Sequence, residues 1–320
     1  MTPRIHVLDS GAVSPDLRFD ADRLRAVTGD ADLTITHDAV RLADEIDGAD
    51  ILLTNSKVNI AALITRAPGL RWVQVISAGV EGYLPTLPAQ VALTNASGVH
   101  SEKGAEFVLA GALMLNYRIP SFLAAQARHD WAQDFVRPLR GKCAVVLGAG
   151  GIGAAAIGLL RDRGMQVVAV TRTGRCTVPV DMTVTINRLA EVLPRANLLV
   201  CTLPATAETT GIIGAAELAL LPEGAGIVNV SRAAIFDKDA LGQALHSSHL
   251  SGLVTDVFHD EPLPKGDPAW DWPGLIATPH CSVDDHEGYI ERCVDIFAEN
   301  LRRFRSGEPL TNRVDPATGY

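Results

Sequence analysis

The sequence predicts an α/β protein built from two doubly wound domains, each with a parallel sheet. Short apolar runs with strand character alternate with amphipathic helical runs along nearly the whole chain, which is the pattern of parallel α/β folds. The chain has 320 residues, 47% of them hydrophobic, enough to form two cores of ordinary size. Near its middle, the apolar run from Ala144 to Leu147 leads into a Gly-x-Gly-x-x-Gly turn.

The part of the chain before about Thr94 predicts the first of these domains. Strands are expected at Ile5–Leu8, Leu33–Thr36, Ile51–Thr54, Trp72–Ile76 and Val91–Thr94. Helical patterns lie between them, at Asp22–Val27 and Asn59–Thr65. This alternation predicts a parallel sheet with helical connections.

Small residues follow the fourth of these strands, where open α/β sheets bind ligands. They are Ser77, Ala78, Gly79 and Val80. Their backbone N–H groups could hold a carboxylate, although an ordinary strand-to-helix turn explains the same residues equally well.

The segment after Thr94 predicts a long helix that connects the two domains. Ser101 has the character of an N-cap, apolar residues recur at helical spacing after it, and Pro120 is expected to close the segment. Trp131 follows in a polar stretch, where its large ring needs a partner. We expect it to pack against a neighbouring loop; a second subunit is the alternative.

The glycine turn predicts a site for the pyrophosphate of a dinucleotide. Gly148 allows the tight turn, Gly150 lets the pyrophosphate approach the backbone, and Gly153 lets the following helix pack on the strand. The phosphates would lie at the helix N-terminus, near Gly151 and Ile152, where N–H groups and the helix dipole favour anions. Close packing without any ligand is the alternative explanation for the glycines. The strand Gln166–Val170 completes a βαβ unit.

The end of that second strand bears on cofactor choice. An Asp or Glu is expected there when NAD is bound, because it accepts hydrogen bonds from the ribose 2′-hydroxyl. This chain has instead Thr171, Arg172, Thr173, Gly174 and Arg175. Two arginines suit a 2′-phosphate, so the sequence predicts a preference for NADPH; the alternative is that both side chains point into solvent.

The rest of the chain predicts a second doubly wound sheet. Strands are expected at Leu198–Thr202, Gly226–Val230, Gly252–Val257 and Leu275–Thr278, with helices near Leu189–Leu193, Ala215–Leu221 and Asp239–His246. Carboxyl ends of parallel strands share one edge, so residues that follow these strands should approach the cofactor. They are Thr202, Leu203, Pro204, Val230, Ser231, Arg232, Asp256, Glu261 and His280. A final helix over Asp285–Phe304, capped by Gly307, returns the chain to the first domain.

Three of these residues form a plausible catalytic set. Arg232 offers a bidentate fork for a carboxylate and its neighbouring carbonyl oxygen, although a phosphate-positioning or surface role is possible. His280 can transfer a proton near neutral pH, and Glu261 can fix its tautomer. A lone histidine is more often structural, but its position beside a dinucleotide turn favours catalysis. Hydride transfer to a carbonyl requires such a proton donor and such an anchor.

The chain resembles the D-isomer-specific 2-hydroxyacid dehydrogenases. The motifs that carry the resemblance are Gly148 to Gly153, Leu203-Pro204 with Glu208 to Gly211, Asn229 to Arg232, Asp256 to Phe258 with Glu261 to Pro264, and Thr278-Pro279-His280. The resemblance implies that Arg232 anchors the substrate, His280 is the acid/base and Glu261 its orienting partner. It further implies that Asp256 lies at the nicotinamide end and that Ala78 to Val80 receive the substrate carboxylate. Asn55 is a further candidate for substrate contact.

The resemblance also predicts an architecture. A Rossmann cofactor domain, residues 99–283, would be inserted into a flavodoxin-like substrate domain formed by residues 1–98 and 284–320, usually in a homodimer. The chain departs from the family at Ala233, where glycine is usual, and at Cys281-Ser282 after the histidine, which leaves the substrate open. Glu261 argues against formate dehydrogenase activity, for which glutamine is typical.

Composition and charge narrow the classes of partner and the compartment that we expect for the protein. A formal charge of -9 argues against nucleic-acid and anionic-membrane partners. Five cysteines without Cys-x-x-Cys pairing, and an N-terminus without a signal-peptide pattern, lead us to expect a cytoplasmic protein without disulfides.

The leading hypothesis is an NADPH-dependent reductase of small 2-keto acids such as glyoxylate or hydroxypyruvate, and a dinucleotide-sensing corepressor-like protein is the alternative. A metal site is a weaker hypothesis; its candidates are Asp256, His259, Asp260, Glu261, His280, Asp284, Asp285 and His286.

Overall fold

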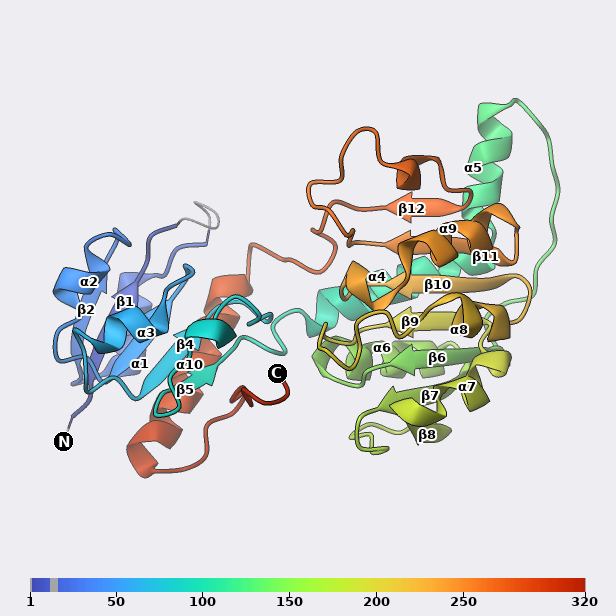
Figure 1. Ribbon diagram of the computed structural model, residues 1–320. Helices are drawn as coiled ribbons and strands as arrows, with labels where there is room; N and C mark the ends of the chain where they lie inside the picture. Colours follow the sequence, from blue (N-terminus) through green and yellow to red (C-terminus); the bar gives the residue numbers. More distant parts are fainter. Residues whose placement is uncertain (1, 12–16, 320) are drawn as a thin grey trace. The chain divides into compact units, whose positions relative to one another are not determined.

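The computed structural model describes residues 2–11 and 17–319, and its chain divides into two compact units (Figure 1). Unit 1 comprises Met1–Val99 and Asp285–Tyr320, and unit 2 comprises His100–Asp284. Both boundaries fall one residue after the positions expected from the sequence. A continuous unit 2 therefore interrupts unit 1, which is made of two separate stretches of chain.

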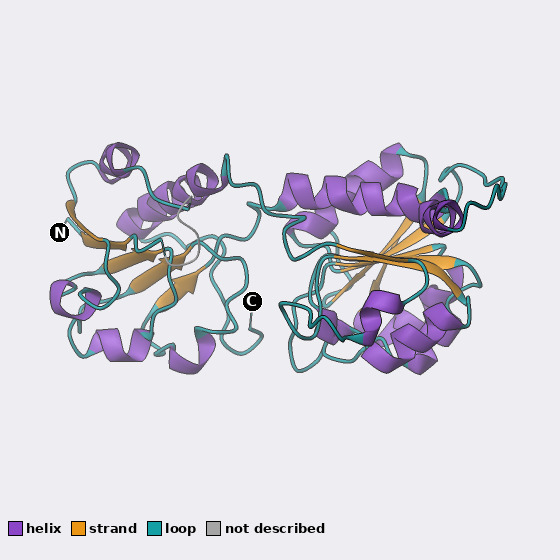
Figure 2. Cartoon of the chain, turned by 90° about the horizontal axis from the view of Figure 1, so that it is seen from above, coloured by secondary structure: helices purple, strands orange, loops and turns teal. Residues whose placement is uncertain are grey.

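Unit 1 contains a five-stranded parallel sheet in the order β2-β1-β3-β4-β5, which is the flavodoxin-like order. The strands are β1 (Arg4–Leu8), β2 (Asp32–Thr36), β3 (Ile51–Thr54), β4 (Trp72–Val75) and β5 (Ala92–Thr94). The helices are α1 (Ala21–Thr28), α2 (Leu42–Glu45), α3 (Ile60–Ile64), the 3-10 turn η1 (Leu84–Thr86) and α10 (Tyr289–Ser306). They cover both faces of the sheet (Figure 2), so the predicted doubly wound fold is confirmed.

Helix α10 is held to unit 1 by aromatic packing. The ring of Trp72 in β4 stacks on Phe297 and Phe304, with ring centroids 5.2 Å and 5.6 Å apart. The helix begins at Tyr289 and not at Asp285, because the Asp285 carboxylate accepts backbone N–H bonds from the turn before the helix. Gly307, in the left-handed conformation with φ 69°, ends the helix as predicted.

Unit 2 contains a seven-stranded parallel sheet in the order β12-β11-β10-β9-β6-β7-β8. Counted from β6, this is the Rossmann order 3-2-1-4-5-6 with one further strand, as predicted. The strands are β6 (Cys143–Leu147), β7 (Gln166–Thr171), β8 (Met182–Thr185), β9 (Leu198–Cys201), β10 (Ala225–Asn229), β11 (Leu250–Thr255) and β12 (Leu275–Ala277). Strand β8 was not predicted, because only one of its four residues is buried and its hydrophobic pattern is weak.

The helices of unit 2 lie on both faces of its sheet (Figure 2). The α-helices are α4 (Ser101–Asn116), α5 (Ile119–Ala127), α6 (Gly151–Asp162), α7 (Leu189–Val192), α8 (Ala215–Leu220) and α9 (Lys238–His246). The 3-10 turns are η2 (Ile186–Arg188), η3 (Leu193–Arg195), η4 (Ala233–Ile235) and η5 (Pro268–Asp271). Within the residues described, no single helix is long and apolar enough to cross a membrane; α4 and α5, bent by 60°, reach that length and composition only together.

Two predictions about the start of unit 2 were wrong. Ser101 is the first residue of α4 rather than its N-cap, which is His100 and forms no side-chain cap bond. Pro120 does not close a helical segment but lies in the first turn of α5, where a missing N–H does no harm. The break comes earlier, at Arg118, whose φ of 57° interrupts the helix.

The expectation that Trp131 packs against a neighbouring loop was also wrong. Its side chain is 91% exposed, and Phe135, four residues later, is 88% exposed. Both lie on the irregular segment that runs from α5 to β6 (Figure 1). The segment therefore presents two large aromatic rings to solvent within this chain.

Candidate active site

The polar residues singled out from the sequence do follow neighbouring strands of unit 2. Arg232 follows β10, Asp256 and Glu261 follow β11, and His280 follows β12. These three strands are adjacent and parallel, so their carboxyl ends form one edge of the sheet.

His280 and Glu261 form a hydrogen-bonded pair at this edge. The Nδ1 atom of His280 lies 2.6 Å from Oε2 of Glu261. The second oxygen, Oε1, accepts the backbone N–H of Phe258 at 2.8 Å, so both carboxylate oxygens are held. An ionised carboxylate only accepts hydrogen bonds, so the pairing places a proton on Nδ1. Nε2 forms no hydrogen bond within the described part of the chain and is the ring nitrogen available for proton exchange.

The buried carboxylate of Asp256 organises the turn that carries His280. Its Oδ1 accepts hydrogen bonds from Thr278 Oγ1 at 2.6 Å, from Cys281 N at 3.0 Å and from Ser282 N at 3.1 Å. The backbone N–H of His280 donates to the Asp256 carbonyl at 3.0 Å, and His280 itself has a φ of 51°. Asp256 therefore holds His280 in an unfavourable backbone conformation, and its burial does not favour the contact with the nicotinamide that the resemblance implies.

An apolar cavity of about 610 Å³ adjoins the pair. Its lining consists of Phe258, Glu261, Pro262, Leu263, Trp270, Ala277, Thr278, Pro279 and His280. The rings of Phe258 and Trp270 are stacked with centroids 6.5 Å apart, and Trp270 Nε1 donates to the Pro264 carbonyl at 2.9 Å. Sequence reasoning missed Trp270, because its contribution comes from the fold of one long loop rather than from a spaced motif.

The loop after β10 shapes the backbone around Arg232. The Asn229 side chain accepts from the Ser231 N–H at 3.1 Å and from the Ser231 hydroxyl at 2.9 Å, and donates to the Arg232 carbonyl at 3.3 Å. Arg232 is half-buried, its backbone is extended, and one guanidinium N–H donates to the Ser231 carbonyl at 2.8 Å. The guanidinium is therefore anchored on one side.

The structure gives a steric reason for two of the three glycines of the turn and an open position for the third. Gly148 has a φ of 90°, which favours glycine. A Cβ on Gly153 would lie 2.2 Å from the Gly148 carbonyl oxygen and 2.6 Å from Thr202 Oγ1, so only glycine fits. A Cβ on Gly150 would meet nothing within 4 Å, so this position faces open space at the start of α6. These residues fit the pyrophosphate of a dinucleotide, which approaches such a turn at a helix N-terminus.

Most of the neighbouring candidates for cofactor contact have side chains that are buried or hydrogen-bonded within unit 2. Leu203, Val230 and Ser231 are buried, and the Ser231 hydroxyl lies 3.1 Å from Cys201 Sγ. Burial raises the pKa of the Cys201 thiol to about 11. The Pro204 carbonyl accepts the Thr209 hydroxyl at 2.6 Å. Side chains of this group therefore support the loops, and their backbone atoms are the parts suited to a ligand.

The residues after β7 form a tight turn with exposed arginines. The Thr171 hydroxyl donates to the Arg175 carbonyl at 3.1 Å, and Gly174 has a φ of 67°. The side chains of Arg172, Thr173 and Arg175 are exposed. No carboxylate stands at this turn, which extends from Thr171 to Arg175.

In unit 1, the loop after β4 has unused backbone donors. The N–H groups of Ala78, Gly79 and Val80 form no hydrogen bond within the described part of the chain. The loop is fixed by the Ser77 hydroxyl, which donates to the Gly79 carbonyl at 2.8 Å, and by Asn95, whose amide donates to the Ala78 carbonyl at 2.7 Å. Three successive free N–H groups are suited to an anion.

Asn55 is placed differently from the expectation. It is buried, and its amide donates to Asp9 Oδ1 at 2.6 Å and to the Leu17 carbonyl at 2.9 Å. Its carbonyl oxygen accepts the Ser10 N–H at 3.0 Å and the Ser56 hydroxyl at 3.3 Å. All four hydrogen-bonding positions are used, which does not favour direct contact with a substrate.

The weaker hypothesis of a metal site has no support in the residues that the structure describes. Among the residues that the structure describes, no group of three or more His, Cys, Asp or Glu side chains is arranged to hold a metal ion. All five cysteines are free thiols.

Comparison with known proteins places this geometry in a family. The sequence model of the family described as "D-isomer specific 2-hydroxyacid dehydrogenase, NAD binding domain" matches residues 109–282. That range contains the glycine turn together with Arg232, Glu261 and His280.

Individual relatives agree with this match. Glyoxylate/hydroxypyruvate reductase A of Salmonella paratyphi C is 29% identical over 263 residues, covering 78% of this chain and 82% of the relative. A D-isomer specific 2-hydroxyacid dehydrogenase from Xanthobacter autotrophicus, solved with NADPH and MES, has a TM-score of 0.85 at 29% identity and covers 100% of both chains. An NADPH-dependent glyoxylate/hydroxypyruvate reductase from Sinorhizobium meliloti, solved with NADP and sulfate, has a TM-score of 0.81 at 25% identity and covers 99% of this chain and 100% of its own. The chain therefore belongs to the D-isomer specific 2-hydroxyacid dehydrogenase family of NAD(P)-dependent oxidoreductases.

Proposed function

We propose that the protein reduces C2 of a small 2-keto acid, glyoxylate or hydroxypyruvate in type, to give a D-2-hydroxy acid. The observation that carries the proposal is the His280–Glu261 hydrogen bond at the same sheet edge as the dinucleotide turn. The names of the Salmonella and Sinorhizobium relatives support the substrate class. NADPH bound at the glycine turn supplies the hydride.

His280 supplies the proton. In its imidazolium form, Nδ1–H donates to Glu261 and Nε2–H is available to the oxygen on C2. As the oxygen gains negative charge, Nε2 transfers its proton to it, and the ring becomes the neutral Nδ1–H tautomer that Glu261 already holds. Because the reaction consumes one proton, the equilibrium ratio of hydroxy acid to keto acid rises about tenfold for each unit by which pH falls.

Two groups are proposed to hold the carboxylate end of the substrate. The Arg232 guanidinium matches a carboxylate and an adjacent carbonyl oxygen through parallel N–H bonds. The free N–H groups of Ala78, Gly79 and Val80 are a second set of donors for a carboxylate. Both assignments follow from the resemblance and from the donors present.

The test is a reductase screen across 2-keto acids with NADPH and with NADH, using wild-type protein and His280→Ala. We expect turnover of glyoxylate or hydroxypyruvate and a loss of kcat of about a hundredfold or more in the variant, since a positioned acid contributes that much. No turnover of any keto acid by the wild type would refute the function and favour a dinucleotide-sensing role. Wild-type kcat in His280→Ala would refute the assignment of the acid.

We further propose that NADPH is preferred over NADH. The exposed Arg172 and Arg175 can bind a 2′-phosphate, and the carboxylate that would repel it is missing from this turn. A hydrogen bond to a charged group contributes about 1.5 to 3 kcal/mol, which corresponds to a preference of about ten to a hundredfold.

Arg172→Asp tests the cofactor preference, with Arg163→Asp as a control on the same unit. We expect Arg172→Asp to weaken NADPH binding by at least about tenfold and to leave NADH binding equal or tighter. Arg163 is exposed and follows the C-terminus of α6, at the end of that helix opposite the glycine turn, so its replacement should leave both affinities unchanged. Equal affinities for NADPH and NADH in the wild type, unchanged in Arg172→Asp, would contradict the preference.

We propose that the protein is a homodimer and that the segment from α5 to β6 lies in the interface. Trp131 and Phe135 are almost fully exposed in the single chain. Each large aromatic side chain buries roughly 150 to 250 Å² when covered, so leaving two exposed is unfavourable. Light scattering should give a dimer for the wild type and a shift toward monomer for Trp131→Ser with Phe135→Ser; a monomeric wild type would contradict the proposal.

A further inference from the structure

A largely buried ion pair fastens the loop that carries Glu261 to helix α9. Lys238 is the first residue of α9, and its Nζ lies 2.6 Å from Oδ2 of Asp267. The Asp267 side chain is 6% exposed and the Lys238 side chain 28% exposed. Removing Lys238 would leave the Asp267 carboxylate almost without contact with water and without its counterion, which is unfavourable.

The helix itself does not explain the lysine at this position. The N-terminus of a helix carries a partial positive charge, so a cation in the first turn is unfavourable there. The N-cap is supplied separately by Asp237, which accepts the Ala240 N–H at 2.8 Å. Lys238 instead holds the pKa of the Asp267 carboxyl below its usual value, with help from the Ala269 N–H. The ion pair therefore accounts for the lysine.

Continuous contacts lead from Asp267 to the catalytic pair. The Asp267 N–H donates to the Pro264 carbonyl at 3.0 Å, and the same carbonyl accepts Trp270 Nε1 at 2.9 Å. The Trp270 ring stacks on Phe258. The Phe258 N–H donates to Oε1 of Glu261, whose other oxygen binds His280. Displacing Asp267 would therefore disturb the support of Glu261.

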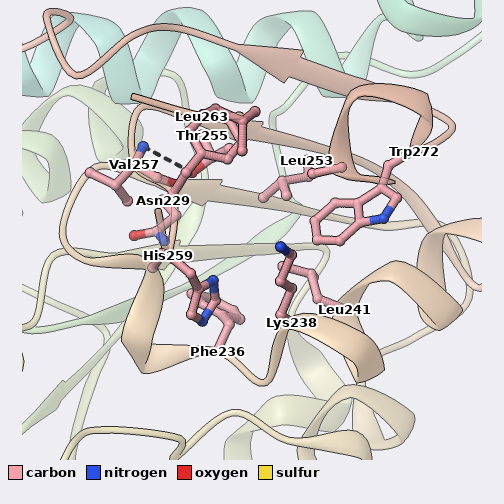
Figure 3. Close-up of a pocket in the computed structure, with 13 residues that line it drawn as sticks. Asn229, Phe236, Lys238, Leu241, Leu253, Thr255, Val257, His259, Leu263 and Trp272 are labelled. Carbon is pink, nitrogen blue, oxygen red and sulfur yellow. Dashed lines mark hydrogen bonds between the residues drawn. The ribbon is translucent and has the colours of Figure 1, made fainter. Parts of the chain in front are cut away.

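The space between α9 and this loop is not fully filled by side chains. A pocket with a cavity of about 20 Å³, room for roughly one water molecule, lies there (Figure 3). Figure 3 shows the Lys238 side chain rising from α9 into this pocket beside the Trp272 ring, with His259 also in its lining. Trp272 packs closely on α9, since a Cβ on Gly242 would lie 2.9 Å from its Nε1. The loop is thus attached to α9 at two places, the Trp272 contact and the Lys238–Asp267 pair, and the small cavity lies between them.

We propose that Lys238 is a positioning residue for the His280–Glu261 pair. By binding Asp267, it fixes the loop segment that supports Trp270 and Phe258, and so keeps the Glu261 carboxylate on Nδ1 of His280. The kinetic consequence rests on the proposed reductase function, whereas the consequence for the histidine tautomer does not.

The test compares wild-type protein with Lys238→Met by ¹⁵N NMR of labelled histidines. His280 is assigned by the loss of its signals in His280→Ala. We expect neutral His280 in the wild type to be the Nδ1–H tautomer, and to shift in Lys238→Met toward the Nε2–H tautomer that an unconstrained imidazole prefers. In parallel, kcat for keto-acid reduction should fall about tenfold, with KM and NADPH affinity within about twofold, because the loss is one of geometry.

Matched variants separate positioning from general destabilisation. Lys238→Arg keeps the charge and should retain the wild-type tautomer and most of kcat. Arg188→Met removes the Arg188–Glu191 pair, which is 56% exposed on both sides, and should change neither readout. Asp267→Asn should reproduce Lys238→Met, and the double variant should be no worse than either single one. If Lys238→Met does not fold, Lys238→Gln replaces it.

The outcomes distinguish this inference from the proposed function. A wild-type tautomer and wild-type kcat in folded Lys238→Met would overturn the inference, even if the protein is an active reductase. A tautomer shift in Lys238→Met would support it, even if the wild type reduces no keto acid and the proposed function fails.

Discussion

Gly153→Ala tests the physical basis of the dinucleotide turn. The added Cβ would lie 2.2 Å from the Gly148 carbonyl oxygen and 2.6 Å from Thr202 Oγ1, whereas real Cβ contacts are essentially never shorter than 3.0 Å. The nearest atom belongs to the backbone, so either α6 or the Gly148 turn must move. Such overpacking costs about 1 to 3 kcal/mol, which exceeds the gain of up to about 1 kcal/mol from replacing a helical glycine with alanine.

Gly158→Ala is the matched control, because Gly158 lies on the same helix and its added Cβ would meet nothing within 4 Å. We expect this change to raise the free energy of unfolding by about 0.5 to 1 kcal/mol. Gly153→Ala should lower it by about 1 to 2 kcal/mol, since its packing cost exceeds the same propensity gain. Urea unfolding followed by far-UV circular dichroism gives both values.

Cofactor affinity provides the second readout of the same pair. Displacing the Gly148 turn moves the backbone that is proposed to receive the pyrophosphate, so NADPH should bind Gly153→Ala at least about tenfold more weakly. Gly158→Ala should keep wild-type affinity, measured by quenching of tryptophan fluorescence. Equal stability and equal NADPH affinity of the two variants would refute the steric argument.

Further changes test the catalytic pair, the anchor and the buried thiols. Glu261→Gln should lower kcat about ten- to a hundredfold at unchanged NADPH affinity, because the bond to His280 loses its charge; an unchanged kcat would contradict the pairing. Arg232→Lys should lower kcat/KM for the keto acid at least about tenfold while NADPH binding stays constant, and equal loss of both would assign Arg232 to the cofactor. In native protein at pH 8, Cys281 should be alkylated and Cys201 should not, by mass spectrometry of the modified peptides. Burial raises the pKa of the Cys201 thiol to about 11, so between about pH 9 and 11 this thiol loses its proton more readily in the unfolded chain than in the folded one. The free energy of unfolding should therefore fall as pH rises over that range, and a flat profile would contradict this.

The sequence was sufficient for the architecture because both sheets consist of strongly apolar strands. The run from Ala144 to Leu147 is wholly buried in β6, so the pattern and the structure agree there. Strand β8 was missed because only one of its four residues is buried, and α5 was missed because Pro120 was expected to end a helical segment rather than to lie in a first turn. Trp131 was misplaced because sequence cannot show whether a neighbouring loop reaches a given ring.

The sequence was enough to predict that Glu261 and His280 form a pair, but not which residues hold that pair in place. Motif order was enough to place Glu261 and His280 at the end of adjacent strands, where the structure has them hydrogen-bonded. The sequence could not show that Asn55 uses all its hydrogen bonds internally, because its partners Asp9 and Leu17 are far from it in the chain. The Lys238–Asp267 pair could not be predicted either, because its two residues are 29 positions apart in the chain.

The loop that bears Glu261 is held at both of its ends by buried carboxylates. Before it, Asp256 accepts hydrogen bonds from the turn around His280, and after it, Asp267 is bound by Lys238. A carboxylate between two fixed points can keep its bond to a neighbouring histidine without being buried itself. This arrangement reconciles two requirements of a general acid, because Nε2 must reach a substrate while Nδ1 must stay bound. The reactive part of the site can thus be open, since its rigidity comes from charges buried on either side of it.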